Sequence, residues 1–186
     1  MSVQQMAGAL TGLGKLYRFD QKGWDDFDKS AQGFWQSFIV AVLLAPLSLN
    51  HRLLQFNAET STLDFVPFAI VEGLSYIITW VLFPFAMLYI ARLLNRTPRY
   101  FAYMVPYIWM QLPIGLLLFS VQILTDVQLL PVEVLEIVNM LTFIAFAVYG
   151  TYIAGIGLQV ATGTALSLVV LDYVLGLLAY QMVAQI

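Results

Sequence analysis

The chain has 186 residues, of which 61% are hydrophobic and 10% are charged, and its net charge is −3. Soluble domains are about 45–50% apolar and about 25% charged, so charges this sparse cannot cover a surface that faces water. The composition predicts a protein that lies mainly in lipid. The absence of cysteine excludes disulfides and thiolate metal sites, and the small net charge does not favour nucleic-acid binding.

Residues 1–32 are predicted to form a cytoplasmic or interfacial segment ahead of the first span. Its first half carries four apolar side chains at helical spacing: Met6, Leu10, Leu13 and Leu16. This spacing fits a short helix on the membrane surface, whereas three nearby glycines favour a partly ordered tail. Its second half mixes both signs of charge with three aromatic residues: Phe19, Trp24 and Phe27. That mixture indicates either aromatic anchoring at headgroup level or a solvated face.

Residues 33–186 are predicted to form an all-α transmembrane domain, a polytopic bundle of five helices. The apolar runs that define the spans cover residues 33–49, 65–94, 101–124, 134–159 and 164–184. The first run is short for a bilayer core that needs about 20 residues, so we expect its helix to continue towards Phe56. Prolines inside the first three spans predict bent helices that pack against neighbours.

Basic residues set the expected orientation of these spans. Arg92, Arg96 and Arg99 lie between the second and third spans, and the other five basic residues precede the second span. Loops rich in lysine and arginine stay in the cytoplasm. We therefore expect the N-terminus inside and the C-terminus outside, in a bacterial inner membrane.

The same basic loop is a candidate contact for lipid headgroups. Four tyrosines flank it and are typical of an aromatic belt at the membrane interface: Tyr89, Tyr100, Tyr103 and Tyr107. Together with Arg92, Arg96 and Arg99 this region either binds an anionic lipid or simply anchors the helices.

Two carboxylates lie inside apolar runs and mark a candidate polar site. Glu72 belongs to the second span and Asp172 to the fifth, and Gln111 and Asn139 lie in two others. Ionisable groups at such depth are costly and are usually functional or paired. Because no lysine or arginine lies at matching depth in the sequence, we expect the two acids to be protonated or satisfied by polar neighbours. They form either a proton or cation relay or a set of hydrogen bonds between helices.

Small residues on the fourth span predict a close packing face. They stand four apart in two pairs: Gly150 with Ala154, and Gly157 with Ala161. Small side chains let two helices approach closely. The face serves either the monomer, which we favour, or an oligomer.

No catalytic motif is present: the chain has no phosphate-binding loop, no nucleophile elbow and no HExxH zinc motif. The single histidine, His51, cannot build a multi-histidine metal or haem site. The sequence therefore predicts a non-enzymatic protein without a metal or cofactor.

Two stretches carry a family resemblance over about residues 33–184. They are RTPRYFAYMVPY, where a basic loop runs into an aromatic third span, and VYGTYIAGIGLQVATGTALSLVVLDYVL, where a small-residue stretch precedes the last span. In both, the chain resembles the bacterial branch of the Yip-domain family. The resemblance implies a non-enzymatic integral membrane protein of a family best known in eukaryotes for vesicle trafficking and contacts with Rab GTPases. The Asp-Leu-Tyr-Gly-Pro stretch of several eukaryotic members is missing, so the resemblance implies the fold rather than Rab binding.

Three functions remain open from the sequence. The first is membrane organisation or protein and lipid interaction, with an oligomer as one form of it. The second is a small permease or channel that uses Glu72 and Asp172. The third is an accessory subunit of a larger membrane complex.

Overall fold

The computed structural model describes residues 3–54, 56 and 63–184, and this part of the chain holds helices and turns but no strand. Five of its helical segments are long and apolar enough to cross a membrane: Ala31–Leu54, Phe65–Leu93, Thr97–Asp126, Val132–Leu158 and Thr162–Ala179. These segments match the five predicted spans within a few residues at most ends. The predicted all-α architecture with five apolar helices is confirmed.

The first span consists of two helices, α2 (Ala31–Ser37) and α3 (Ile39–Leu54), which meet at Phe38. The buried Ser37 hydroxyl donates a hydrogen bond of 2.6 Å to the carbonyl of Phe34. That carbonyl is the acceptor that the Phe38 amide would use in a continuous helix. The interruption therefore lies at Ser37–Phe38, whereas Pro46 lies inside α3.

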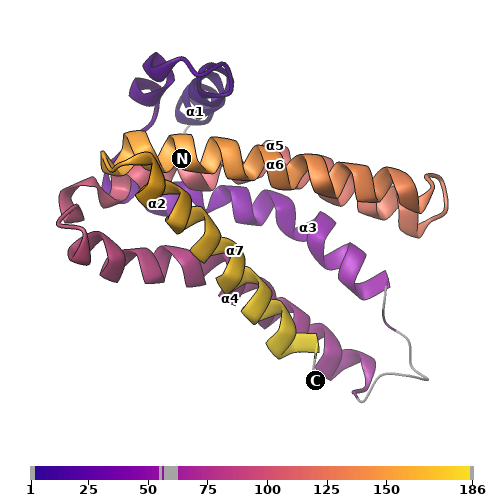
Figure 1. Cartoon of the computed structure of the whole chain (residues 1–186). Coiled ribbons are helices and arrows are strands. Elements are labelled where there is room, and N and C mark those ends of the chain that lie inside the picture. The colour runs from indigo at the N-terminus through magenta and orange to yellow at the C-terminus, as the bar shows by residue number, and fades with distance from the viewer. Residues whose placement is uncertain (1–2, 55, 57–62, 185–186) are drawn as a thin grey trace.

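The remaining spans are α4 (Phe65–Leu93), α5 (Tyr100–Asp126, preceded by the short helix η2, Thr97–Arg99), α6 (Val132–Leu158) and α7 (Thr162–Ala184). Helix α5 is the centre of the molecule, because it packs against α1, α2, α3, α4 and α6. Its residues from Tyr103 to Met110 are all buried. Helix α6 runs beside α5, and α7 turns back from the end of α6 and contacts both α6 and α4 (Figure 1).

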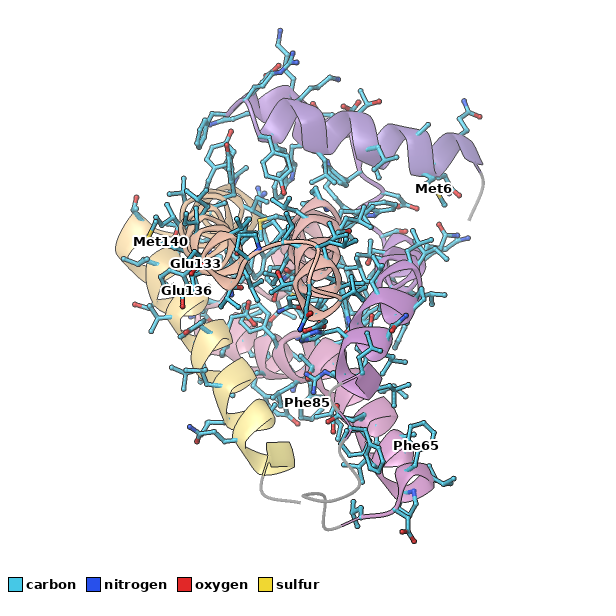
Figure 2. All side chains as sticks on the ribbon, turned by 90° about the vertical axis from the view of Figure 1, so that its right-hand side faces the viewer. Met6, Phe65, Phe85, Glu133, Glu136 and Met140 are labelled. Atoms are coloured by element: carbon cyan, nitrogen blue, oxygen red, sulfur yellow. The ribbon has the colours of Figure 1, made fainter. Side chains whose placement is uncertain are left out.

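The N-terminal segment forms a helix, α1 (Val3–Leu16), followed by the short helix η1 (Gln21–Asp26). Helix α1 lies on the outside of the bundle and crosses the direction of α5 and α6 (Figures 1 and 2). Leu13 and Leu16 of the predicted apolar face are buried, whereas Leu10 is 46% exposed. Of the predicted membrane anchors, Trp24 and Phe27 are buried in the same hydrophobic core as the spans. These two aromatic residues thus contact protein, which corrects the expectation that they anchor the chain in headgroups.

Side chains from two spans hold this N-terminal segment. The Tyr17 hydroxyl donates to the carbonyl of Met110 in α5 at 3.1 Å. In turn, Tyr149 and Tyr152 of α6 donate to the carbonyls of Tyr17 and Phe19 at 3.0 and 2.9 Å. Burial raises the pKa of Tyr17 above its ordinary value, so its hydroxyl remains a donor at any physiological pH. The segment is therefore a fixed part of the fold.

The connections between the spans gather at two opposite ends of the bundle. Figure 1 shows α2, the η2 loop and the α6–α7 turn at one end. The ends of α3 and α7, the start of α4 and the α5–α6 turn lie at the other. This arrangement is the one expected for five spans that alternate in direction.

Candidate functional site

A cavity of about 470 Å³ lies between the spans and is lined by side chains from α3, α4, α5, α6 and α7. Most of its wall is apolar and aromatic, with polar groups contributed by four helices: Ser48, Arg52, Tyr76, Tyr107, Gln111 and Asp172. On one side of the cavity α3 and α5 are in close contact. A Cβ atom on Gly115 of α5 would lie 2.6 Å from the Leu44 side chain of α3. The cavity has the size and composition of a site for a small organic molecule.

Asp172 is the acidic group of this cavity. The Tyr107 hydroxyl of α5 donates a hydrogen bond of 2.6 Å to its Oδ2 atom. Gln111 follows Tyr107 by one helical turn and lines the same wall. The ion pairs found in the described part of the chain do not include Asp172. Its carboxyl group therefore faces the cavity with a hydroxyl as its partner and without a basic side chain beside it.

A second tyrosine of α5 lies next to this pair. The rings of Tyr103 and Tyr107 are 5.7 Å apart between centroids, and Phe83 of α4 lies 4.9 Å from Tyr107. The Tyr103 side chain is fully buried, and among the described residues its hydroxyl has no hydrogen-bond partner. A buried hydroxyl without a partner is rare and requires an explanation.

Glu72, the other predicted acid, is paired with Arg52 of α3 at 2.7 Å between Oε2 and Nη1. The expectation that no arginine lies at matching depth is therefore wrong for Glu72. The expected continuation of the first helix past residue 49 is present, since α3 extends to Leu54, and it brings Arg52 to the depth of Glu72. Glu72 itself is 8% exposed, while the Arg52 side chain lines the cavity.

His51, the neighbour of Arg52, forms a second link from the same turn of α3. Its Nδ1 atom contacts the Oδ2 atom of Asp126 at the end of α5. Consecutive residues of α3 thus tie this helix to α4 and to α5 at one end of the bundle. Sequence analysis predicted neither of these two pairs. The available signal was a pair of basic residues at the end of one span with acids near the corresponding ends of two others.

The structure brings together only part of the predicted polar site. Asp172 and Gln111 share the cavity, and Glu72 is next to it through Arg52. Asn139 lies elsewhere, because its side chain is exposed on α6 and the cavity is lined there by Phe146.

The predicted small-residue face of α6 packs largely within the chain. A Cβ atom on Gly150 would lie 3.1 Å from Val169 of α7. One on Gly157 would lie 2.8 Å from the Cα atom of Tyr103. Ala154 between them is fully buried, whereas Ala161 lies beyond the end of α6 and is exposed. Three of the four predicted residues therefore hold α6 against its own neighbours.

The basic loop is exposed, but its tyrosines are not an aromatic belt. Arg92 and Arg96 are exposed and Arg99 is half-buried. Of the four flanking tyrosines only Tyr89 is exposed, and the others are buried in the core: Tyr100, Tyr103 and Tyr107. The reason is the central position of α5, which turns these side chains inward. This finding corrects the belt interpretation for the three tyrosines of α5.

Across the described residues, no group of three or more His, Asp or Glu side chains is placed to hold a metal ion. Comparison of the chain with protein-family models, with curated proteins and with solved structures finds no match.

Proposed function

We propose that this chain is an integral membrane protein that binds a small, largely apolar molecule within its bundle, as the binding step of a permease or carrier. The observation that carries this proposal is the cavity of about 470 Å³ among the spans, with Asp172 in its wall. Ligand sites of about 300–1,000 Å³ usually combine an apolar wall with a few polar groups that orient the ligand. An ionisable residue inside a membrane bundle is by default part of such a site.

The cavity also differs from a simple packing defect. Its wall combines an acid, an amide and several hydroxyls from separate helices, although such groups are costly to place in a bundle unless they find partners. Arg52, Tyr76 and Asp172 already have partners in the chain, but the convergence of polar side chains from four helices on one cavity supports a ligand site over a packing defect.

The interaction role expected first from the sequence has less support. The small-residue face of α6 is occupied by Val169 and Tyr103 of the same chain, so this face is not free for an oligomer. The Yip-domain resemblance, the lipid contact of the arginine loop and the role as an accessory subunit stay predictions. We also propose the orientation with the N-terminus inside, in a bacterial inner membrane, on the basis of the three arginines between α4 and α5.

Two glycines provide a matched test of the cavity. Gly176 lines it and Gly73 does not, and a Cβ atom on either would meet nothing within 4 Å. The neutral fluorophore phenylnaphthylamine is titrated into lipid nanodiscs that contain the protein, with empty nanodiscs subtracted. We expect saturable binding that Gly176→Phe abolishes by filling the cavity and that Gly73→Phe preserves.

The result that would overturn the proposal is equally direct. Without saturable binding, or with equal binding by Gly176→Phe and Gly73→Phe, the cavity is not a ligand site.

A further inference from the structure

We propose that the ligand of this cavity is a lipophilic organic cation and that Asp172 is its counter-ion, releasing a proton when the cation binds. This inference rests on the proposed binding function and adds the class of ligand to it.

The charges of the cavity favour a cation. Arg52 is already neutralised by Glu72 at 2.7 Å. Asp172 receives a hydrogen bond from Tyr107 and belongs to none of the ion pairs found in residues 3–54, 56 and 63–184. The unmatched ionisable group in the wall is thus an acid. An anionic ligand would meet no free positive charge there, whereas a cation would meet a carboxyl group.

The aromatic wall favours an organic cation over a metal ion. Seven aromatic residues line the cavity together with Asp172: Tyr76, Trp80, Phe83, Tyr107, Phe119, Phe146 and Tyr173. Aromatic faces attract ammonium groups, most strongly where water is excluded. A small inorganic cation instead needs about six oxygen ligands, whereas the wall offers one carboxylate, with its hydroxyls and its amide spread over separate helices. The cavity is therefore matched to an ammonium group on an apolar body.

Tyr103 provides a second and independent observation. Its hydroxyl is fully buried beside Tyr107 and has no partner in the part of the chain that the structure describes. An ionised carboxylate accepts several hydrogen bonds, more than its neutral form needs. We infer that the Tyr103 hydroxyl, an unused donor one helical turn from Tyr107, serves the ionised form of this site.

The proton balance follows from the depth of Asp172. An isolated carboxylate in an apolar bundle is costly, so the empty cavity holds the neutral acid. A cation that enters forms an ion pair with the carboxylate, and the O–H bond of Asp172 breaks, so one proton leaves for each cation bound. The other titratable or charged groups around the cavity and at its outer end are the Arg52–Glu72 pair, the His51–Asp126 pair, Tyr76, Tyr103, Tyr107 and Tyr173. None of them is an unpaired carboxyl.

The test uses two molecules of one shape. Benzyltrimethylammonium is permanently charged, and neopentylbenzene replaces its nitrogen by carbon. Both compete with phenylnaphthylamine for the protein in zwitterionic nanodiscs. Because one proton leaves when the cation binds, we expect cation affinity to rise about tenfold for each unit of pH increase in the range below the titration of Asp172, and to level off above it. Calorimetry in buffers of different ionisation enthalpy should show one proton released per cation.

Variants separate the counter-ion from the cavity. Asp172→Asn should lose at least tenfold in affinity for the cation and retain the neutral molecule. Glu136→Gln is the matched control, because Glu136 is a carboxylate of α6 that is exposed and outside the cavity wall; it should bind both molecules as the unchanged protein does. If Asp172→Asn does not fold, the proton count on the unchanged protein still decides.

The possible results separate the cation inference from the proposed binding of a small molecule in the cavity. Binding of the neutral molecule alone, binding of the cation without proton release, or equal cation binding by Asp172→Asn would each overturn the inference and leave the binding function standing. If neither molecule displaces phenylnaphthylamine and the fluorophore itself does not bind, both fail.

Discussion

At the scale of single residues, two acids that look alike in the sequence have different surroundings. Glu72 and Asp172 both interrupt apolar runs. In the structure Glu72 is paired with Arg52, whereas the partner of Asp172 is the hydroxyl of Tyr107. A paired charge inside a bundle serves packing, and a carboxyl group without a cation leaves room for a ligand to supply one. This difference favours a structural role for Glu72 and supports our proposal that Asp172 is the binding residue.

The Arg52–Glu72 pair makes the first prediction at this scale. Removal of one partner leaves the other charge in a largely buried position, which costs about 3 kcal/mol of unfolding free energy. We expect this loss for Arg52→Gln. Arg52→Gln combined with Glu72→Gln should lose less, since no charge is then left alone. The measurement is denaturant unfolding in mixed micelles.

A matched control exists for this pair on the neighbouring helix. Arg92 is exposed at the end of α4, and Arg92→Gln should change the unfolding free energy by less than about 0.5 kcal/mol. If the effects of Arg52→Gln and Glu72→Gln simply add in the double variant, the two side chains do not stabilise each other.

At the scale of elements, the contact between α5 and α6 depends on one glycine. A Cβ atom on Gly157 would lie 2.8 Å from the Cα atom of Tyr103 and 3.0 Å from the ring of Trp24. Backbone cannot yield as a flexible side chain can, so Gly157→Ala must push α6 away from α5. We expect Gly157→Ala to lower the unfolding free energy by about 1–3 kcal/mol. The measurement is again denaturant unfolding in mixed micelles.

Gly155 provides the control for this contact. It lies on the same helix, and a Cβ atom there would find its nearest neighbour at 4.0 Å. Gly155→Ala should leave stability unchanged or slightly raised, because alanine favours the helix. Equal losses for the two variants would mean that helix propensity and not the α5 contact explains Gly157.

The spans could be predicted from the sequence, but the inward faces of the helices could not. A long apolar run identifies a helix in lipid, since its backbone must satisfy its own hydrogen bonds. Because these runs are apolar on all sides, they do not show which face points inward. The tyrosines of α5 were therefore assigned to the interface although Tyr100, Tyr103 and Tyr107 are buried.

The residues of the cavity could be predicted only in part, because the sequence does not show which helix faces point inward. Asp172 and Gln111 could be identified from the sequence alone, because each is a polar residue inside a long apolar run. The partnership of Arg52 with Glu72 depends on how far α3 extends and on how α3 lies against α4. No pattern within a single segment contains that information.

At the scale of the whole molecule, the two ends of the bundle differ in character. The end with the η2 loop carries Arg92, Arg96 and Arg99, and the N-terminal segment packs nearby through Trp24 against Gly157. At the opposite end, basic residues His51 and Arg52 are paired with acids. Free positive charge is thus concentrated at one end. Such asymmetry is what orients a chain during membrane insertion.

This asymmetry leads to a prediction about topology. Alkaline phosphatase is active only outside the bacterial cytoplasm, so the enzyme is fused after Pro98 in the basic loop, after Gly163 in the first turn of α7, and at Ile186, which lies outside the described residues. We expect no activity at the first two positions and high activity at Ile186, with fusions of green fluorescent protein giving the reverse pattern. Activity at Pro98 and Gly163 but not at Ile186 would invert the orientation. Activity at all three positions would contradict five alternating spans and would place one of the apolar helices on the surface of the membrane instead of across it.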